Sequence, residues 1–314
     1  MAATAPTDVI AAPPAAAPRV GGWRDYVTLA KPGITALIVL VAVGGFVFAA
    51  PARIDLVRLG WLVLFGAMAS AGAAMLNHYL DRDVDGMMRR TRTRPLPQAR
   101  IDPSARVAVL GLAFSAVGVA GATLALNPLT GVSILLGGFT YVVVYTAWLK
   151  RRSSWNIVIG GFAGSAPALA GSAAAVGGWT PGVLAFALLV FLWTPPHFWS
   201  LALLLKDDYR AARLPMLPDM DDVAFSARVV VISAALLVPA TALVVWLGPV
   251  TLPALIALAA LGLLFVVLVA PLWRSSERRT ARRGFLYSGP YLLGVIGALV
   301  ANSALLVHGF SPVF

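Results

Sequence analysis

The chain has 314 residues, of which 60% are hydrophobic and only 12% are charged. These fractions exclude an ordinary soluble domain, in which about 45–50% of residues are apolar and roughly 25% are charged. The net charge of +11 is also found in nucleic-acid-binding proteins, but here the basic residues lie between the apolar segments or at their ends, which is typical of membrane topology. Cysteine is absent, so disulfides and thiolate metal sites are excluded, and a metal would need oxygen or imidazole ligands.

Residues 1–23 are rich in alanine and proline and lack the charged and apolar regions of a secretory signal, so we expect a disordered tail. A single transmembrane domain is expected over residues 24–314. Within it, apolar segments of about 17–25 residues recur, which is the helix length needed to cross a hydrocarbon core of about 30 Å. The sequence predicts an all-α polytopic membrane protein with about nine transmembrane helices. The predicted spans are 33–50, 57–79, 106–126, 130–148, 156–176, 182–205, 228–247, 251–272 and 287–308.

Two pairs of these spans are joined by very short connections, at residues 127–130 and 248–250, and each connection contains a proline that favours a tight hairpin over a merged span. When the nine spans alternate, all but two of the 24 Lys and Arg residues fall on one side, and the exceptions are Arg53 and Arg58. Positive residues concentrate on the cytoplasmic side of membrane proteins. We therefore expect a cytoplasmic N-terminus and a C-terminus on the outer side.

The end of the second span carries Asn77, Asp81 and Asp85 at intervals of four residues. If the helix continues, this spacing places the three side chains on one face, while Asp83 points elsewhere. Carboxylates one turn apart repel each other and suit a hard cation such as Mg²⁺. The arginine-rich segment 89–97 adds guanidinium groups, which bind phosphate oxygens in pairs. We predict that Asn77, Asp81 and Asp85 are metal ligands in a diphosphate site; the alternative is salt bridges with Arg82, Arg89 and Arg90 on a solvated loop.

A second acidic cluster, residues 206–210, follows the sixth span and contains Asp207 and Asp208. Four spans separate the two clusters, so both emerge on the same side of the membrane and are expected to face one cavity. Asp207 and Asp208 are the predicted ligands of a second metal ion, and the pattern leaves open which of them binds it.

The order of these motifs resembles the UbiA-type intramembrane aromatic prenyltransferase superfamily, whose members carry one acidic motif after helix 2 and another after helix 6. The blocks are most similar to those of the protoheme IX farnesyltransferase family. One departure is that Ala211 and Ala212 occupy the positions where many superfamily members have a further aspartate. The blocks that carry the resemblance are 81–91, 94–97, 145–152, 156–161, 193–199, 206–209 and 214–218.

This resemblance implies a helical bundle around a central cavity and an Mg²⁺-dependent prenyltransferase. The implied reaction moves a farnesyl group from farnesyl diphosphate to a vinyl group of heme b, with water addition, and gives heme o for respiratory terminal oxidases. A quinone-pathway polyprenyltransferase is the alternative, although block 193–199 argues against it. The implied partners are heme b, farnesyl diphosphate, the lipid bilayer of a bacterial cytoplasmic membrane and a downstream heme A synthase, with no nucleic acid.

The resemblance also implies roles for individual residues. Asp81, Asp85 and Lys206 would be catalytic, and Arg94, Lys206 and the less favoured Arg90 would offset diphosphate charge. Aromatic rings stabilise carbocations, which suggests Tyr145, Trp199 and Tyr209 as substrate contacts, although lipid-interface anchoring or helix packing also explains such residues.

His197 follows two prolines inside the sixth predicted span. Such irregular backbone is tolerated in a membrane where it faces protein or a cavity, and an intramembrane imidazole is a functional candidate. A contact to a heme propionate or to heme iron, and an interhelical hydrogen bond, both remain open.

Overall fold

The computed structural model describes residues 21–216 and 222–314. By length and composition, nine helical segments of this described part could cross a membrane, in agreement with the predicted number. The helices in chain order are α1 (Trp23–Leu29), α2 (Pro32–Ala49), α3 (Leu56–Leu80), α4 (Arg82–Met87), α5 (Ala105–Ala125), α6 (Pro128–Phe139), the π-helix η1 (Thr140–Trp148), the 3₁₀-helix η2 (Leu149–Arg151), α7 (Asn156–Gly160), α8 (Phe162–Val176), α9 (Pro181–Leu204), α10 (Lys206–Ala211), α11 (Val223–Ala235), α12 (Leu237–Leu247), α13 (Leu252–Val269), the 3₁₀-helix η3 (Ala270–Trp273) and α14 (Arg278–Val307).

The spans agree with the prediction to within a few residues, except at the starts of the last span and the seventh. Helix α14 begins at Arg278, nine residues before the predicted start at 287, and the seventh span begins at Val223 rather than at 228. Hydropathy marks only the apolar part of a helix, and the first turns of α14 carry several arginines that extend it beyond the apolar segment. Residues 1–20 of the predicted tail lie outside the described residues, and residue 23 already begins α1.

Both short connections form tight turns held by an asparagine. The side chain of Asn127 caps α6 by accepting from the Thr130 amide at 2.9 Å, and Pro128 occupies the first turn, where its missing N–H costs nothing. At the other hairpin, Asn302 of α14 accepts from the Thr251 amide at 2.8 Å and donates to the Pro249 carbonyl at 2.7 Å. These bonds satisfy buried backbone groups that lipid could not satisfy.

Small residues let neighbouring spans approach closely. A Cβ atom at Gly45 in α2 would overlap the backbone of Ala168 in α8, and one at Gly171 would overlap the backbone of Ala42. Close backbone approach through glycine is a common way to pack helices within a membrane. The largest buried cluster instead uses bulky side chains from α9 and α11 to α14, among them Phe186, Phe265 and Tyr291.

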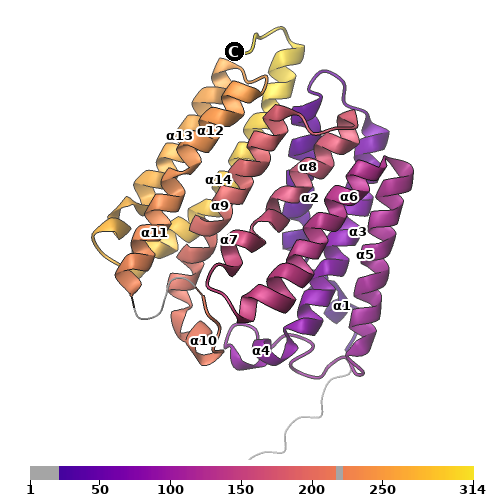
Figure 1. Cartoon of the computed structure of the whole chain (residues 1–314), viewed down its shortest axis with the longest axis vertical. Helices are drawn as coiled ribbons and strands as arrows, with labels where there is room; N and C mark the ends of the chain where they lie inside the picture. The colour runs from indigo at the N-terminus through magenta and orange to yellow at the C-terminus, as the bar shows by residue number, and fades with distance from the viewer. Residues whose placement is uncertain (1–20, 217–221) are drawn as a thin grey trace, which may run out of the picture.

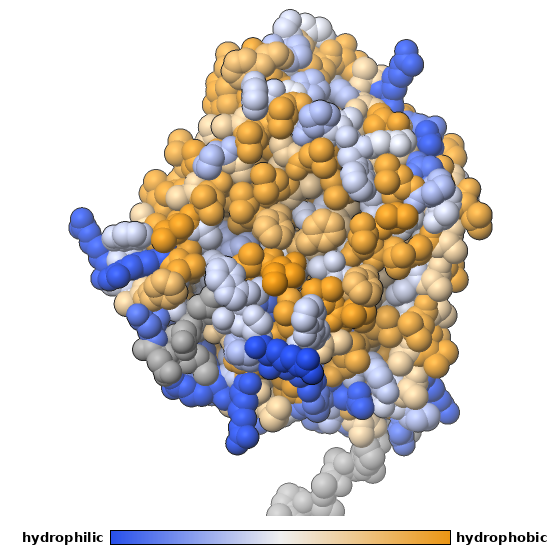
Figure 2. All heavy atoms as spheres, in the orientation of Figure 1, coloured by the Kyte–Doolittle hydropathy of each residue, from blue (hydrophilic) through white to orange (hydrophobic). Residues whose placement is uncertain are grey.

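Figure 1 shows the long helices side by side, with the short helices α1, α4 and α10 gathered at one end and the C-terminus at the other. On the face seen in Figure 2, apolar residues form a broad band, and many of the hydrophilic ones lie at the end that carries the short helices. This arrangement is that of a multi-pass membrane protein. The two acidic motifs lie at the same end, as the topology predicts.

Candidate active site

A cavity of about 630 Å³ lies between the helices and is mostly apolar. Its walls come from α2, α3, α6, η1, α8 and α9, with Phe285 contributed by α14. Charged and polar side chains gather in one part of the lining: Lys31, Asn77, His78, Asp81, Asp85, Arg90, Arg94 and Lys150. A cavity with this distribution suits an amphipathic ligand that has an anionic head and an apolar tail.

The predicted row of Asn77, Asp81 and Asp85 is present. Helix α3 ends at Leu80 and α4 starts at Arg82, but the backbone bonds of the Asp81 amide to the Asn77 carbonyl (2.9 Å) and of the Asp85 amide to the Asp81 carbonyl (2.7 Å) keep the helical register across the join. All three side chains are buried from bulk solvent and line the cavity. The Asn77 amide donates to Asp81 Oδ2 at 2.8 Å, so the row is a connected group.

Each member of this row contacts a cationic side chain from another segment. Lys31 Nζ donates to Asn77 Oδ1 at 2.5 Å. Lys150 Nζ lies 2.6 Å from Asp81 Oδ2, and Arg94 Nη1 lies 2.7 Å from Asp85 Oδ2. These cations offset the repulsion between the two carboxylates.

The alternative reading, salt bridges on a solvated loop, is therefore wrong for Asp81 and Asp85. Both carboxylates are buried, and their partners are Lys150 and Arg94 rather than the predicted arginines. That alternative describes Asp83 better, because this side chain points away from the cavity, is 59% exposed and pairs with Arg151 at 2.6 Å. The hydrogen bond from Arg151 lowers the pKa of Asp83 to about 2.

Lys31 and Lys150 are site residues that sequence reasoning missed. Lys31 caps α2 in the left-handed conformation, with φ of 47°, a strained state for a residue with a Cβ that is often found at functional sites. Its Nζ also donates to the Tyr141 hydroxyl at 3.0 Å. Burial, followed by the nearby charge of Arg94, lowers the pKa of Lys31 to about 8. In the sequence, both lysines look like ordinary topology signals at the ends of spans.

The π-helix η1 supports the same site. Wide π-helical turns occur mostly at functional positions. This one places Tyr141 and Tyr145 on the cavity wall with their rings stacked at 6.2 Å between centroids. It also places the Thr146 hydroxyl 3.0 Å from the Asn77 amide, which donates to it. The fourth span therefore contacts the acidic row directly and helps to hold Asn77 in position.

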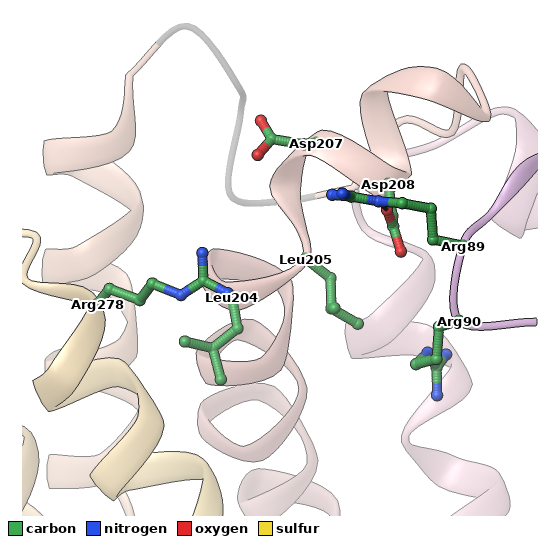
Figure 3. Close-up of a pocket in the computed structure, with 7 residues that line it drawn as sticks. All are labelled: Arg89, Arg90, Leu204, Leu205, Asp207, Asp208 and Arg278. Carbon is green, nitrogen blue, oxygen red and sulfur yellow. Dashed lines mark hydrogen bonds and ion pairs between the residues drawn. The ribbon is translucent and has the colours of Figure 1, made fainter.

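The second acidic cluster lies in an adjoining cavity of about 410 Å³ rather than beside the first row (Figure 3). Asp208 is buried and its Oδ1 lies 3.1 Å from Arg89 Nε, whereas Asp207 is exposed. Arg278 reaches this cavity from α14, and Arg90 lines both cavities. Within residues 21–216 and 222–314, no three His, Asp or Glu side chains converge as a metal site. The structure thus brings the first row together and leaves Asp207 and Asp208 apart from it.

The other predicted site residues divide between the large cavity and places outside its walls. Arg90, Arg94, Tyr145, His197 and Tyr209 line it. Burial raises the pKa of Tyr209 above its ordinary value.

Two predicted site residues lie elsewhere. Lys206 is exposed at the start of α10. Trp199 is packed into the main buried cluster, because it stands two residues after His197 and so projects from nearly the opposite side of α9. The indole on the cavity wall is that of Trp193, which sequence reasoning did not select.

In the described residues, nine helices long and apolar enough to span a membrane surround an apolar cavity with carboxylates and cations in one part of its lining, which is the architecture of a multi-pass membrane protein with an internal ligand site. The chain belongs to the UbiA prenyltransferase family, whose model matches residues 37–289. This result confirms the resemblance inferred from the motif blocks, and the chain is a prenyltransferase.

The chain is similar over most of its length to proteins named protoheme IX farnesyltransferase. It is 40% identical to one from Sulfurisphaera tokodaii, with 88% of this chain and 92% of that protein covered. It is also 40% identical to protoheme IX farnesyltransferase 1 of Paramagnetospirillum magneticum, with 89% and 98% covered. Among solved structures, a UbiA homolog from Archaeoglobus fulgidus bound to GPP and Mg²⁺ is similar with a TM-score of 0.72 at 18% identity, covering 90% of this chain and 99% of that one. This structural likeness confirms the predicted fold.

Proposed function

We propose that this prenyltransferase transfers the farnesyl group of farnesyl diphosphate to a vinyl group of heme b, with addition of water, to give heme o. The observation that carries the proposal is the continuity of the acidic row with an apolar cavity, which matches a diphosphate head and a prenyl tail. The choice of heme b as acceptor is supported by the names of relatives that are about 40% identical over nearly their whole length.

The residues of the row fit a magnesium ion. Asp81 Oδ1 is buried and has no hydrogen-bond partner in the described chain, so this oxygen is available to coordinate a cation. Together with Asn77 and Asp85 it forms the oxygen-only donor set that Mg²⁺ prefers. When bound, the ion would neutralise the diphosphate and stabilise it as a leaving group. Asp207 or Asp208 would serve a second ion from the adjoining cavity.

The cations around the row would then bind the diphosphate oxygens. Lys31, Lys150 and Arg94 already lie 2.5 to 2.7 Å from oxygens of the row. Charge-assisted bonds of this kind are about twice as strong as neutral ones. Arg90, which lines both cavities, would add a further positive charge near the diphosphate.

The apolar part of the cavity would hold the prenyl chain while the new C–C bond forms. The allylic C–O bond breaks and its electron pair leaves with the diphosphate, and the vinyl group of the acceptor supplies the pair that forms the new C–C bond. Water then adds to the resulting cation and loses a proton, which gives the hydroxyl group of the product. The stacked rings of Tyr141 and Tyr145 present π faces that stabilise positive charge.

We further propose that the enzyme lies in the cytoplasmic membrane of a bacterium, with the end that carries α1, α4 and α10 on the cytoplasmic side. The near one-sided distribution of Lys and Arg supports this orientation. A heme A synthase that takes up heme o is the proposed downstream partner.

The test uses the purified full chain with heme b, farnesyl diphosphate and Mg²⁺. We expect heme o, identified by mass, and we expect its formation to stop when EDTA removes the metal and to resume when Mg²⁺ is added back. If a prenylated hydroxybenzoate formed while heme b stayed unchanged, the acceptor would be a quinone precursor and the proposal would be wrong.

A further inference from the structure

The hydrogen bonds around His197 determine which of its nitrogens carries the proton. Its Nδ1 lies 2.5 Å from the hydroxyl of Ser288 in α14. That hydroxyl donates its only proton to the carbonyl oxygen of Phe285, 2.6 Å away. Ser288 therefore has only lone pairs to offer the imidazole, so Nδ1 is the N–H donor and Nε2 keeps its lone pair.

The ring is also held in place by its neighbours. It stacks on Trp193 with 4.6 Å between centroids and packs against Phe285 at 5.2 Å. Trp193 is fixed in turn, because its Nε1 donates to the backbone carbonyl of Ser288 at 2.9 Å. Within the described chain the ring makes its hydrogen bond through Nδ1 and none through Nε2. His197 lines the large cavity, so a ligand there can reach the ring. The site therefore presents one oriented lone pair to a ligand.

We propose that Ser288 is a positioning residue that holds His197 as its Nδ1–H tautomer, so that Nε2 binds the iron of a heme substrate as an axial ligand. The inference rests on the proposed function, because it takes heme as the acceptor. Histidines that ligate metals almost always donate their other N–H to an oxygen acceptor, which fixes the tautomer and raises the basicity of the ligating nitrogen. Neutral histidine is also a common axial ligand of heme iron.

The depth of His197 fits two substrates bound at once. His197 stands seven residues before the end of α9 at Leu204, which is about 10 Å along the helix. Asn77 stands only three residues before the end of α3, so His197 lies deeper in the bundle than the acidic row. Ligation at His197 keeps the porphyrin in the apolar part of the cavity. The acidic row then stays free for the diphosphate of the second substrate.

The other two histidines lack these features. His78 lines the cavity, but neither of its ring nitrogens has a hydrogen bond in the described chain, and its Nδ1 lies 3.9 Å from Asp85 Oδ2, inside the diphosphate site. His308 is exposed at the C-terminal cap of α14. The chain thus supplies His308 as a matched control.

The test measures heme ligation without turnover. The purified full chain in lipid nanodiscs is given ferrous heme b and no farnesyl diphosphate, and the iron–histidine stretching band is recorded by resonance Raman spectroscopy. We expect this band in the wild type and in His308→Ala. It should be lost in His197→Ala and return when free imidazole is added to fill the vacated space.

Ser288→Ala tests the positioning role. Without the Ser288 hydroxyl, the Nδ1–H of His197 loses its hydrogen-bond acceptor and Nε2 becomes a weaker electron donor to iron. The iron–histidine band should therefore shift to lower frequency, and heme binding should weaken about tenfold or more. Ser288→Thr keeps the hydroxyl and should restore both values. Monodisperse elution of each variant confirms folding, and His197→Gln replaces His197→Ala if the latter fails to fold.

Four outcomes overturn a part of this account. A band that persists in a heme-loaded His197 variant excludes His197 as the ligand. A Ser288→Ala spectrum and affinity equal to wild type remove the role of Ser288. Wild-type protein that makes heme o without any iron–histidine band refutes the ligation while the proposed function stands. Wild-type protein that neither binds nor farnesylates heme refutes the proposed function itself.

Discussion

Lys150 and Asp81 form a buried ion pair between the fourth span and the end of the second, with Nζ 2.6 Å from Oδ2 and side-chain exposures of only 13% and 2%. The same carboxylate is the central member of the proposed metal-binding row. The other oxygen, Oδ1, has no partner in the described chain, so Lys150 pairs with only one of the two carboxylate oxygens of Asp81. The pair therefore leaves one carboxylate oxygen of Asp81 available to a second cation.

Lys150→Met should destabilise the metal-free protein, because it leaves Asp81 buried without its charge partner. Breaking a buried pair in this way costs about 3–5 kcal/mol. Saturating Mg²⁺ should recover much of the loss, since the ion replaces the missing charge. The measurement is thermal unfolding in detergent with and without Mg²⁺, with Lys150→Arg as the control that keeps the charge. Equal unfolding temperatures for wild type and Lys150→Met without Mg²⁺ would contradict this account.

Asp81→Asn and Asp85→Asn should each lower heme o formation by at least about a hundredfold, the loss of roughly 3 kcal/mol of charge stabilisation at the leaving group. The variants should remain folded in the membrane but be less stable than wild type, because Asn keeps the shape of the side chain while Lys150 or Arg94 loses its charge partner. Asp83→Asn is the matched control from the same turn, and it should keep near-normal activity because Asp83 points toward Arg151. Near-normal activity in either of the first two variants would refute the metal assignment.

The Asp83–Arg151 pair should contribute little to stability and only above acidic pH. The folded-state pKa of Asp83 is lowered from 3.8 to about 2, so its contribution is present above about pH 4 and is lost as the pH falls toward 2. Asp83 is 59% exposed, and solvent screening limits such a pair to about 0.2–1 kcal/mol. Unfolding of wild type and Asp83→Asn, compared at pH 7 and pH 3, should show a small difference that shrinks at the lower pH. A difference that grows on acidification would contradict the sign of this shift.

Hydropathy was sufficient to predict the nine spans seen in the described part of the chain, and the spacing of four residues was sufficient to predict the row of Asn77, Asp81 and Asp85. Both patterns are local, because a helix repeats every 3.6 residues whatever packs around it. The first span, for example, was predicted over 33–50 and is observed over Pro32–Ala49.

The cations of the site could not be predicted in the same way. Lys31 lies 46 positions from Asn77, and Lys150 lies 69 positions from Asp81, so only packing of distant spans brings them together. In sequence they resemble every other basic residue at the end of a span. That Trp193 rather than Trp199 lines the cavity could not be predicted for a related reason. Both belong to one aromatic block of α9, and the neighbouring helices decide which face of that helix meets the cavity.

Gly160→Ala should change which prenyl diphosphate the enzyme prefers. A Cβ atom at Gly160 would lie 2.7 Å from Cδ2 of Tyr145, so the Tyr145 ring would have to move on the cavity wall. Displacing this ring reduces the space for a long apolar tail, and overpacking of this kind costs about 1–3 kcal/mol. We expect kcat/KM for farnesyl diphosphate to fall about tenfold or more, with a smaller loss for geranyl diphosphate. Gly164→Ala is the control on the same wall, because its Cβ would make only an ordinary contact of 3.7 Å with Thr194. Equal losses for the two diphosphates would show that Tyr145 does not bound the prenyl tail.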